Sequence, residues 1–181
     1  MGKEVIVPLA NGLEEIEAVG IIDILRRAKI KVIPAAIKSK KVKASRGVTL
    51  LADVYWKDIK DRIFDGIILP GGYRGTQTLL NTPSIIAAVK KHFYNGSLVA
   101  AICAAPLVLQ KAEIINSRKI TCHPAVVQEL SSVKYLNKKV VKDENIITAQ
   151  GPGVVFDFSL ALVEVLTDKK IAQQIAREII I

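Results

Sequence analysis

Short runs of apolar residues alternate with longer amphipathic stretches along almost the whole chain, and this alternation limits the folds that it can form. Apolar runs of strand length occur at 4–10, 30–37, 65–70 and 97–103. Residues 14–28 and 84–96 instead repeat apolar side chains at helical spacing. The apolar face predicted for the first helix consists of Ile16, Val19, Ile22 and Leu25. Strands that alternate with helices favour an α/β sandwich with a mostly parallel sheet.

The remaining segments extend this pattern. Residues 42–53 predict a small hairpin, and 104–114 predict a helix directly after a strand. Further predicted strands and helices occupy 119–124, 139–153, 154–168 and 169–179. The sequence has no linker rich in Pro, Gly or Ser and no internal repeat, and 50% of its residues are hydrophobic. We therefore expect one domain, residues 1–181, with a sizeable core.

The composition argues against several classes of protein. The formal net charge is +9, but the lysines are scattered and only 5% of residues are aromatic, which disfavours a nucleic-acid groove. No apolar run is long enough to cross a membrane, so we do not expect a membrane as a partner. Two cysteines are too few for a disulfide scaffold, and no secretory cleavage pattern follows the first apolar run. We expect a reducing, cytoplasmic location.

Cys103 stands at a junction that favours chemistry. The stretch LVAAICAAPLVL, residues 98–109, runs from a predicted strand into a predicted helix, with Cys103 at the turn. Parallel sheets bind ligands beyond the carboxyl ends of their strands, and a sharp turn there needs small neighbours such as these alanines. Free N–H groups at a helix N-terminus lower the pKa of a thiol. An inert core cysteine fits this segment equally well, so the segment alone leaves both interpretations open.

A second predicted strand ends in a pair of glycines. The stretch ILPGGY places Gly71 and Gly72 where their backbone can approach a ligand closely. If this loop lies beside Cys103, the N–H groups of Gly72 and Ala104 form an oxyanion hole. Taken by itself, the Gly-Gly pair is better explained by a plain tight turn. The stretch QGPG, residues 150–153, is a further candidate to close the pocket with backbone groups.

Two titratable side chains are candidates to act with the thiol. Glu17 is expected on the inward face of the first helix, where desolvation keeps its proton on, whereas Glu14 and Glu15 are expected to face solvent. His123 follows another predicted strand at the same sheet edge. Cys with His is a recognised nucleophile pair, although a lone His is more often structural.

The other Cys and His residues are predicted to be structural. Cys122 precedes His123 and alternates to the opposite face of its strand, which places it in the core. His92 is expected on the surface at a helix end. These residues supply too few ligands for a closed zinc site, so no metal is expected.

Taken together, these segments resemble the DJ-one/ThiJ/PfpI superfamily, closest to its DJ-one/YajL branch, within the fold group of class I glutamine amidotransferases. The motifs that carry the resemblance span nearly the whole chain: EEIEA, SRGVTLLAD, ILPGG, AAICAAP, HP and QGPG…FDF. The resemblance implies a flavodoxin-like three-layer sandwich with helices on both faces of the sheet. It also implies a homodimer and a reaction without a cofactor.

The resemblance also assigns roles to particular residues. Cys103 is implied as the reactive nucleophile, Glu17 as its hydrogen-bonding carboxyl and His123 as the nearby histidine. Gly72 and Ala104 are implied as the oxyanion-hole backbone, next to Gly71. The SRGV segment places Arg46 where the family contributes an arginine from the partner subunit to the pocket mouth.

The activity expected from the resemblance is that of a glyoxalase or deglycase, acting on methylglyoxal or on early glycation adducts, with protection against oxidative stress. The alternative is a redox-sensing stress chaperone that oxidises Cys103 without turnover. A peptidase is disfavoured because Ala104 stands where the protease-like branch has a histidine. We further expect strained backbone dihedrals at Cys103 and a small, shallow pocket suited to a two- or three-carbon aldehyde.

Overall fold

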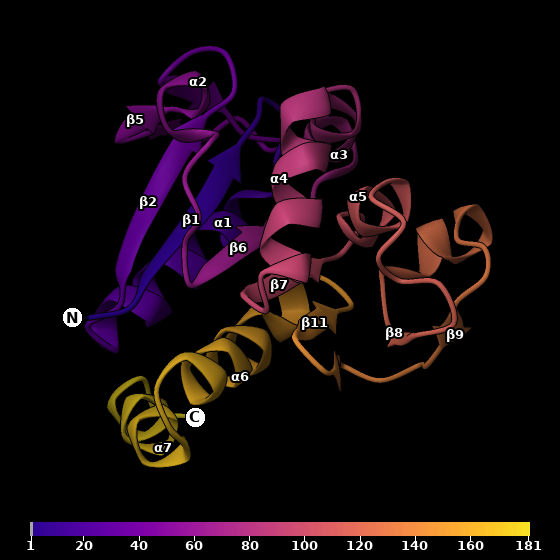
Figure 1. Cartoon of the computed structure of the whole chain (residues 1–181). Helices are drawn as coiled ribbons and strands as arrows, with labels where there is room; N and C mark the ends of the chain where they lie inside the picture. The colour runs from indigo at the N-terminus through magenta and orange to yellow at the C-terminus, as the bar shows by residue number, and fades with distance from the viewer. Residues whose placement is uncertain (1) are drawn as a thin grey trace.

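The computed structural model describes residues 2–181 and contains the predicted parallel sheet. Its seven strands pair in the order β10-β11-β7-β6-β1-β2-β5, and every pair is parallel except β10 with β11. The strands are β1 (Glu4–Leu9), β2 (Lys31–Ala36), β5 (Val54–Tyr55), β6 (Gly66–Leu69), β7 (Leu98–Ile102), β10 (Val140–Asp143) and β11 (Ile146–Ala149). Figure 1 shows this sheet behind helix α4.

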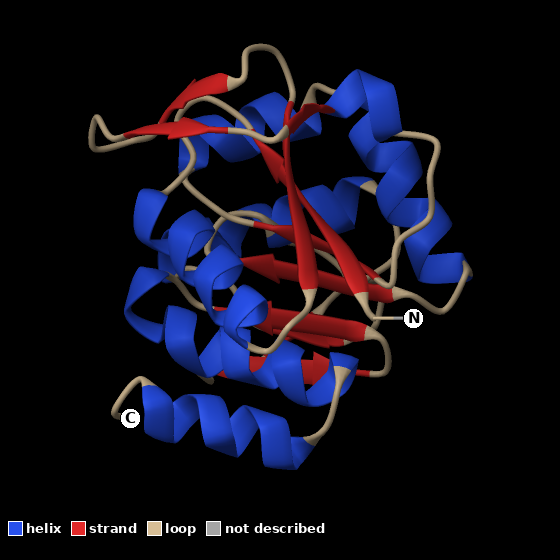
Figure 2. Ribbon diagram, turned by 90° about the vertical axis from the view of Figure 1, so that its left-hand side faces the viewer, coloured by secondary structure: helices blue, strands red, loops and turns tan. Residues whose placement is uncertain are grey.

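Helices cover both faces of the sheet, which confirms the three-layer sandwich. On one face lie α1 (Glu15–Arg27), α6 (Val155–Leu166) and α7 (Lys169–Glu178). On the other lie α2 (Trp56–Ile59), α3 (Tyr73–Leu80), α4 (Pro83–Tyr94) and α5 (Pro106–Lys111), and Figure 2 shows the two helical layers edge-on. Val5 and Val7 belong to the first apolar cluster and Ile6 to the second. Because both faces are covered, the central strands are apolar at successive positions.

The predicted hairpin is confirmed as β3 (Lys41–Lys43) and β4 (Thr49–Leu51), which pair antiparallel outside the main sheet. Its backbone is attached to the loop between β1 and α1. Gly12 N donates to Lys43 O over 2.8 Å, and Ser45 N donates to Leu13 O over 2.8 Å. These bonds place the turn of the hairpin beside the carboxyl end of β1.

Three local predictions were wrong. Helix α3 was missed because its sequence, YRGTQTLL, contains a glycine and few apolar residues. Helix α5 begins at Pro106 rather than at residue 104, since the chain is still turning after Cys103. Strand β8 (Lys119–Ile120) pairs with β9 (Lys134–Tyr135) in a separate small sheet, so His123 does not follow a strand of the main sheet.

The apolar face of α1 also differs from the prediction. Ile16 is 57% exposed and Val19 46% exposed. Leu25 and Glu17 pack inward as predicted, together with Glu15, Ala18, Ile21 and Ile24. Apolar side chains occupy more than one side of this helix, and periodicity alone does not tell which side meets the sheet.

His92 is buried, contrary to the predicted surface position, with only 1% of its surface exposed. Its Nε2 accepts a hydrogen bond from Phe64 N over 3.0 Å, and its Nδ1 lies 2.8 Å from Ala88 O. Burial lowers the pKa of His92, which favours the neutral ring that this pair of contacts requires. Its role is to satisfy the backbone where the chain enters β6.

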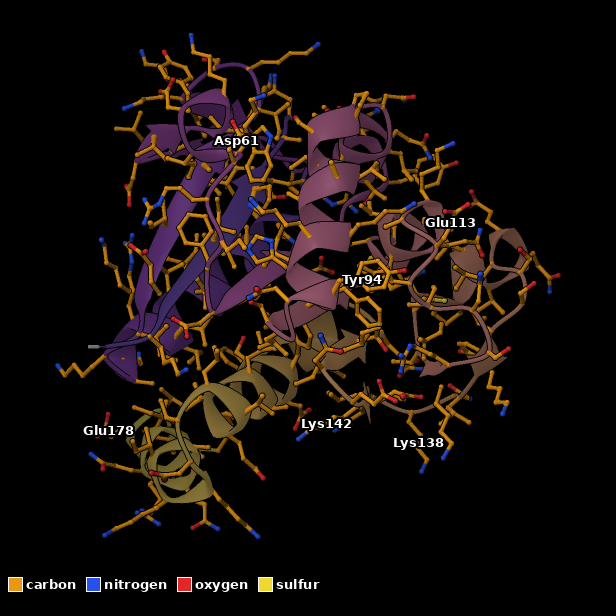
Figure 3. All side chains as sticks on the ribbon, in the orientation of Figure 1. Asp61, Tyr94, Glu113, Lys138, Lys142 and Glu178 are labelled. Carbon is orange, nitrogen blue, oxygen red and sulfur yellow. The ribbon has the colours of Figure 1, made fainter. Side chains whose placement is uncertain are left out.

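Charged side chains surround the molecule rather than gather on one face. In Figure 3, Asp61, Glu113, Lys138 and Glu178 project from separate parts of the surface. Among residues 2–181, no helix has both the length and the apolar character needed to cross a membrane.

Candidate active site

Cys103 adopts a left-handed backbone conformation, with φ of 64°, directly after β7. Cys103 N donates to Ala149 O of β11 over 2.9 Å, and Cys103 O accepts from His123 N over 2.8 Å. A non-glycine residue in this region is strained and is retained only where its surroundings fix it. The expected strained turn is confirmed, and it brings the half-buried thiol to the carboxyl edge of the sheet.

The two glycines allow the loops after β1 and β6 to approach each other closely. Gly72 has φ of 85°, and a Cβ there would lie 2.5 Å from both Glu14 N and Gly12 O. At Gly71, a Cβ would lie 2.6 Å from Cys103 Cβ and 2.7 Å from Glu17 Oε2. No side chain larger than hydrogen fits at either position, so the Gly-Gly pair is more than a turn signal here.

Glu17 is fully buried beside Cys103, as expected. Its Oε2 accepts a hydrogen bond from Gly71 N over 2.7 Å, while Oε1 has no hydrogen-bond partner among residues 2–181. Burial raises the pKa of Glu17 to about 7, and the charge of Glu14 adds to the rise. A carboxyl that keeps its proton near neutral pH is able to donate a hydrogen bond to the sulfur.

The thiol pKa differs from the expectation of a lowered value. Burial raises the pKa of Cys103 to about 12, and a charge on Glu17 contributes to this rise. The N–H groups of Gly72 and Ala104 lie close to the sulfur, and their hydrogen bonds lower the thiol pKa and so offset part of the rise. Because Glu17 and Cys103 interact strongly, they titrate as a pair. When Glu17 keeps its proton, its contribution to the rise is absent.

His123 lies along the same hollow as Cys103, with an exposed ring. Its Nδ1 accepts a hydrogen bond from Ala125 N over 3.2 Å, which leaves the proton of a neutral ring on Nε2. Cys122 is fully buried, as predicted. Because β8 lies outside the main sheet, no strand of that sheet positions His123. Its backbone N–H donates to Cys103 O, and this bond holds the histidine beside the site.

The hollow above Cys103 has a volume of about 840 Å³, which is larger than the small pocket predicted. The reason is that the β3–β4 hairpin and loop 11–12 contribute walls of their own. Arg46, exposed on the turn of that hairpin, lines the hollow of its own chain, as does Pro152 from the QGPG segment. Within residues 2–181, no group of three or more His, Cys, Asp or Glu side chains is placed to hold a metal ion.

Sequence reasoning missed two cations that line the hollow. Lys43 ends β3, and Arg74 lies in the first turn of α3. A signal was available, because both stand within three residues of recognised motifs, SRGV and ILPGG. The two acids next to Glu17 also differ from expectation: Glu15 is buried and accepts hydrogen bonds from Ser45 Oγ and Arg46 N, and Glu14 caps α1 through Glu17 N.

The fold and the site together define a flavodoxin-like α/β protein with a cysteine at a strained turn on the carboxyl edge of its sheet. The family model described as the DJ-1/PfpI family matches residues 3–165. The chain therefore belongs to the DJ-1/PfpI family, as its motifs indicated.

Several relatives illustrate the match. Protein dj-1beta of Drosophila melanogaster is 36% identical over 184 residues, which cover 100% of this chain and 98% of the relative. The crystal structure of Drosophila melanogaster DJ-1beta matches with a TM-score of 0.97 and covers 100% of this chain and 99% of that one. A Caenorhabditis elegans protein named glutathione-independent glyoxalase DJR-1.2 is 39% identical over 155 residues, covering 84% of this chain and 82% of the relative. The chain spans less than half the length of two Arabidopsis thaliana relatives, at 37% and 45%.

Proposed function

We propose that the protein is a cofactor-free glyoxalase that converts methylglyoxal to lactate at Cys103. The observation that carries this proposal is the contact of Cys103 and Glu17 across Gly71, where burial raises the pKa of Glu17 to about 7. The name of the Caenorhabditis elegans relative supports the same activity. A nucleophile with an adjacent proton donor, at a hollow open to solvent, suits addition to an aldehyde.

The proposed reaction balances without an external oxidant or reductant. Cys103 thiolate adds to the aldehyde carbon, and the resulting alkoxide, held by the N–H groups of Gly72 and Ala104, takes the proton of Glu17. The proton on that carbon then moves to the neighbouring carbonyl carbon through an enediol, with Glu17 and His123 as the proton carriers. This leaves lactate bound to sulfur as a thioester, which water hydrolyses. One carbon is oxidised and its neighbour reduced, so methylglyoxal plus water gives lactate.

Proton NMR in D₂O tests this proposal. The purified protein, supplied with methylglyoxal and no other thiol, is expected to form lactate that carries deuterium at C2, because an enediol exchanges its proton with solvent. Buffer alone and heat-denatured protein serve as controls. Consumption of methylglyoxal without lactate would contradict the proposal, since simple adduct formation on lysine and arginine gives that result.

The same chemistry extends to early glycation adducts, in which the aldehyde is already attached to a side chain. Release of lactate from a preformed adduct, after free methylglyoxal has been removed, separates a deglycase from a glyoxalase.

A second candidate is redox sensing, and Glu17 favours it. A protonated carboxyl beside the sulfur is a donor that stabilises a sulfinate, which the N–H groups of Gly72 and Ala104 also approach. Mild peroxide is expected to add two oxygens at Cys103 and none at the buried Cys122, and peptide mass spectrometry locates them. Glu17→Leu is expected to abolish the selective addition. Oxidation of Cys122 before Cys103 would reject sensing at this site.

We further propose a homodimer and a reducing compartment. Exposed apolar side chains on α1 and the hairpin, among them Ile16, Val19, Val48 and Leu51, support a second copy as the partner. In such a dimer Arg46 is expected to reach the pocket mouth of the other subunit. Both cysteines are free thiols, which suits a reducing environment.

A further inference from the structure

The hollow above Cys103 is lined by three basic side chains without a partner among residues 2–181. Lys43, Arg46 and Arg74 line it, against one carboxyl side chain, that of Glu14. Throughout residues 2–181, none of these three basic side chains forms an ion pair or donates a side-chain hydrogen bond. Arginines elsewhere pair with carboxylates, among them Arg26, Arg27, Arg62 and Arg118.

Loop 11–12 holds the backbone of Lys43 on one side of Gly12 and that of Arg74 on the other. Gly12 N donates to Lys43 O over 2.8 Å, and Asn11 Oδ1 accepts from Lys43 N over 2.9 Å. On the other side, a Cβ at Gly12 would lie 2.6 Å from Arg74 Cβ. Lys43 and Arg74 therefore start next to the same glycine while their charged ends remain unpaired.

The acids nearest the hollow keep their negative charge, but within residues 2–181 they accept hydrogen bonds from neutral groups rather than forming ion pairs with these cations. Glu14 Oε2 accepts from Glu17 N over 2.8 Å. Glu15 accepts from Ser45 Oγ over 2.9 Å and from Arg46 N over 2.8 Å. Because burial raises the pKa of Glu17 to about 7, its charge is reduced at neutral pH. The three cations therefore outnumber the ionised carboxylates of Glu14 and Glu15, and the site keeps an excess of positive charge.

From this geometry we infer that the protein favours anionic substrates over neutral ones such as methylglyoxal: a carboxylate or phosphate group beyond the reacting carbonyl binds between Lys43 and Arg74. The chemistry at Cys103 rests on the proposed function, whereas the anion selectivity rests on the lining of the hollow. The volume agrees, since a three-carbon aldehyde fills only a small part of about 840 Å³.

Alkylation of Cys103 by a charge-matched pair of reagents tests the selectivity without any turnover. Iodoacetamide and iodoacetate both form an S–C bond and release iodide, but only iodoacetate carries a negative charge. Both reagents react with the thiolate, so the fraction of thiolate cancels when the rate with iodoacetate is divided by the rate with iodoacetamide. This ratio reports the local charge. Peptide mass spectrometry measures the two rates at Cys103. We expect their ratio there to exceed that of free cysteine by about tenfold, and to fall as salt is added.

The double variant Lys43→Gln with Arg74→Gln is expected to return the ratio to nearly that of free cysteine. The matched control is Lys169→Gln with Lys170→Gln, which removes two positive charges from α7, and Figure 1 places α7 far from α3. A wild-type ratio equal to that of free cysteine, or one that the double variant leaves unchanged, overturns the inference.

Turnover distinguishes the failure of this inference from the failure of the proposed function. Phenylglyoxal and 4-carboxyphenylglyoxal share one reacting group and differ by a carboxylate. We expect the double variant to lower the ratio of kcat/KM, anionic over neutral, by about tenfold. Turnover of both compounds with an unchanged ratio overturns the selectivity alone. Turnover of neither, with the alkylation ratio high, rejects the glyoxalase and supports the anionic site.

Protection experiments identify the anion. Inorganic phosphate or acetate is added during alkylation of Cys103 by iodoacetamide, with chloride at equal ionic strength as the control. Protection by phosphate alone assigns a phosphate-bearing substrate, and protection by acetate assigns a carboxylate. If neither phosphate nor acetate slows the alkylation of Cys103 more than chloride does, the inference of a bound anion is contradicted.

Discussion

Replacing Cys103 by alanine is expected to lower kcat/KM for methylglyoxal by about a thousandfold or more, because no other side chain at the site can form the hemithioacetal. The substitution removes one sulfur atom from a residue whose backbone is held by Ala149 and His123, so the fold is expected to persist. The loss is measured by enzymatic assay of lactate, with the folded state checked by circular dichroism.

Cys122→Ala is the matched control, since it removes the other thiol of the chain from a fully buried position. We expect its turnover to stay within a few-fold of wild type. Equal activity in Cys103→Ala and the wild type would exclude Cys103 as the nucleophile. Loss confined to a well-folded Cys122→Ala would transfer that role to the second cysteine.

Glu17→Gln is expected to reduce kcat/KM by about a hundredfold, the effect typical of losing a positioned proton donor. The pH dependence is more diagnostic than the magnitude. In the proposed mechanism, the reactive state of the wild type has one proton shared between Glu17 and Cys103. The pair loses its first proton near the pKa of Glu17, about 7, so wild-type kcat/KM is expected to rise with pH through that value.

In Glu17→Gln the thiol must lose its own proton, so the inflection is expected to move above that of the wild type. Burial keeps the pKa of Cys103 high even after the charge of Glu17 is gone. An inflection near 7 that survives in Glu17→Gln would show that a group other than Glu17 controls the profile.

Stability supplies an independent measurement on the same variant. The folded-state pKa of Glu17, about 7, exceeds its ordinary value of 4.5, so the folded protein binds the extra proton. Its contribution to the free energy of unfolding is therefore complete below pH 4.5 and is lost as the pH rises toward 7, by about 3 kcal/mol. Urea unfolding is expected to show this loss in the wild type but not in Glu17→Gln. Parallel pH profiles for the two proteins would contradict a raised pKa.

His92 acts in the opposite direction in an overlapping pH range, so the variant must be compared with the wild type rather than with a calculated slope. Burial lowers the pKa of His92, and the fold therefore loses stability as the pH falls below the ordinary value of histidine. Since Glu17→Gln leaves His92 unchanged, the difference between the two profiles isolates Glu17.

The sequence by itself determined the class of fold and the position of the thiol. Fully apolar strand-length runs alternating with amphipathic helices are compatible with few arrangements besides a covered parallel sheet. Cys103 at the end of one run, with alanines around it, and Gly71 and Gly72 at the end of another then fall at one edge. This follows because the carboxyl ends of parallel strands all lie on the same side.

Only the tertiary structure decided which side chains are covered and which cations converge. Periodicity shows where apolar residues recur but not which neighbour packs against them, so Ile16 and Val19 were expected inside and His92 outside. The burial of His92 depends on Phe64 N, 28 residues away in sequence. Lys43 and Arg74 come together through loop 11–12, and Glu17 owes its raised pKa to burial among loops that are distant in sequence. Such long-range contacts leave no local pattern, because they depend on how distant loops meet rather than on the residues within either one.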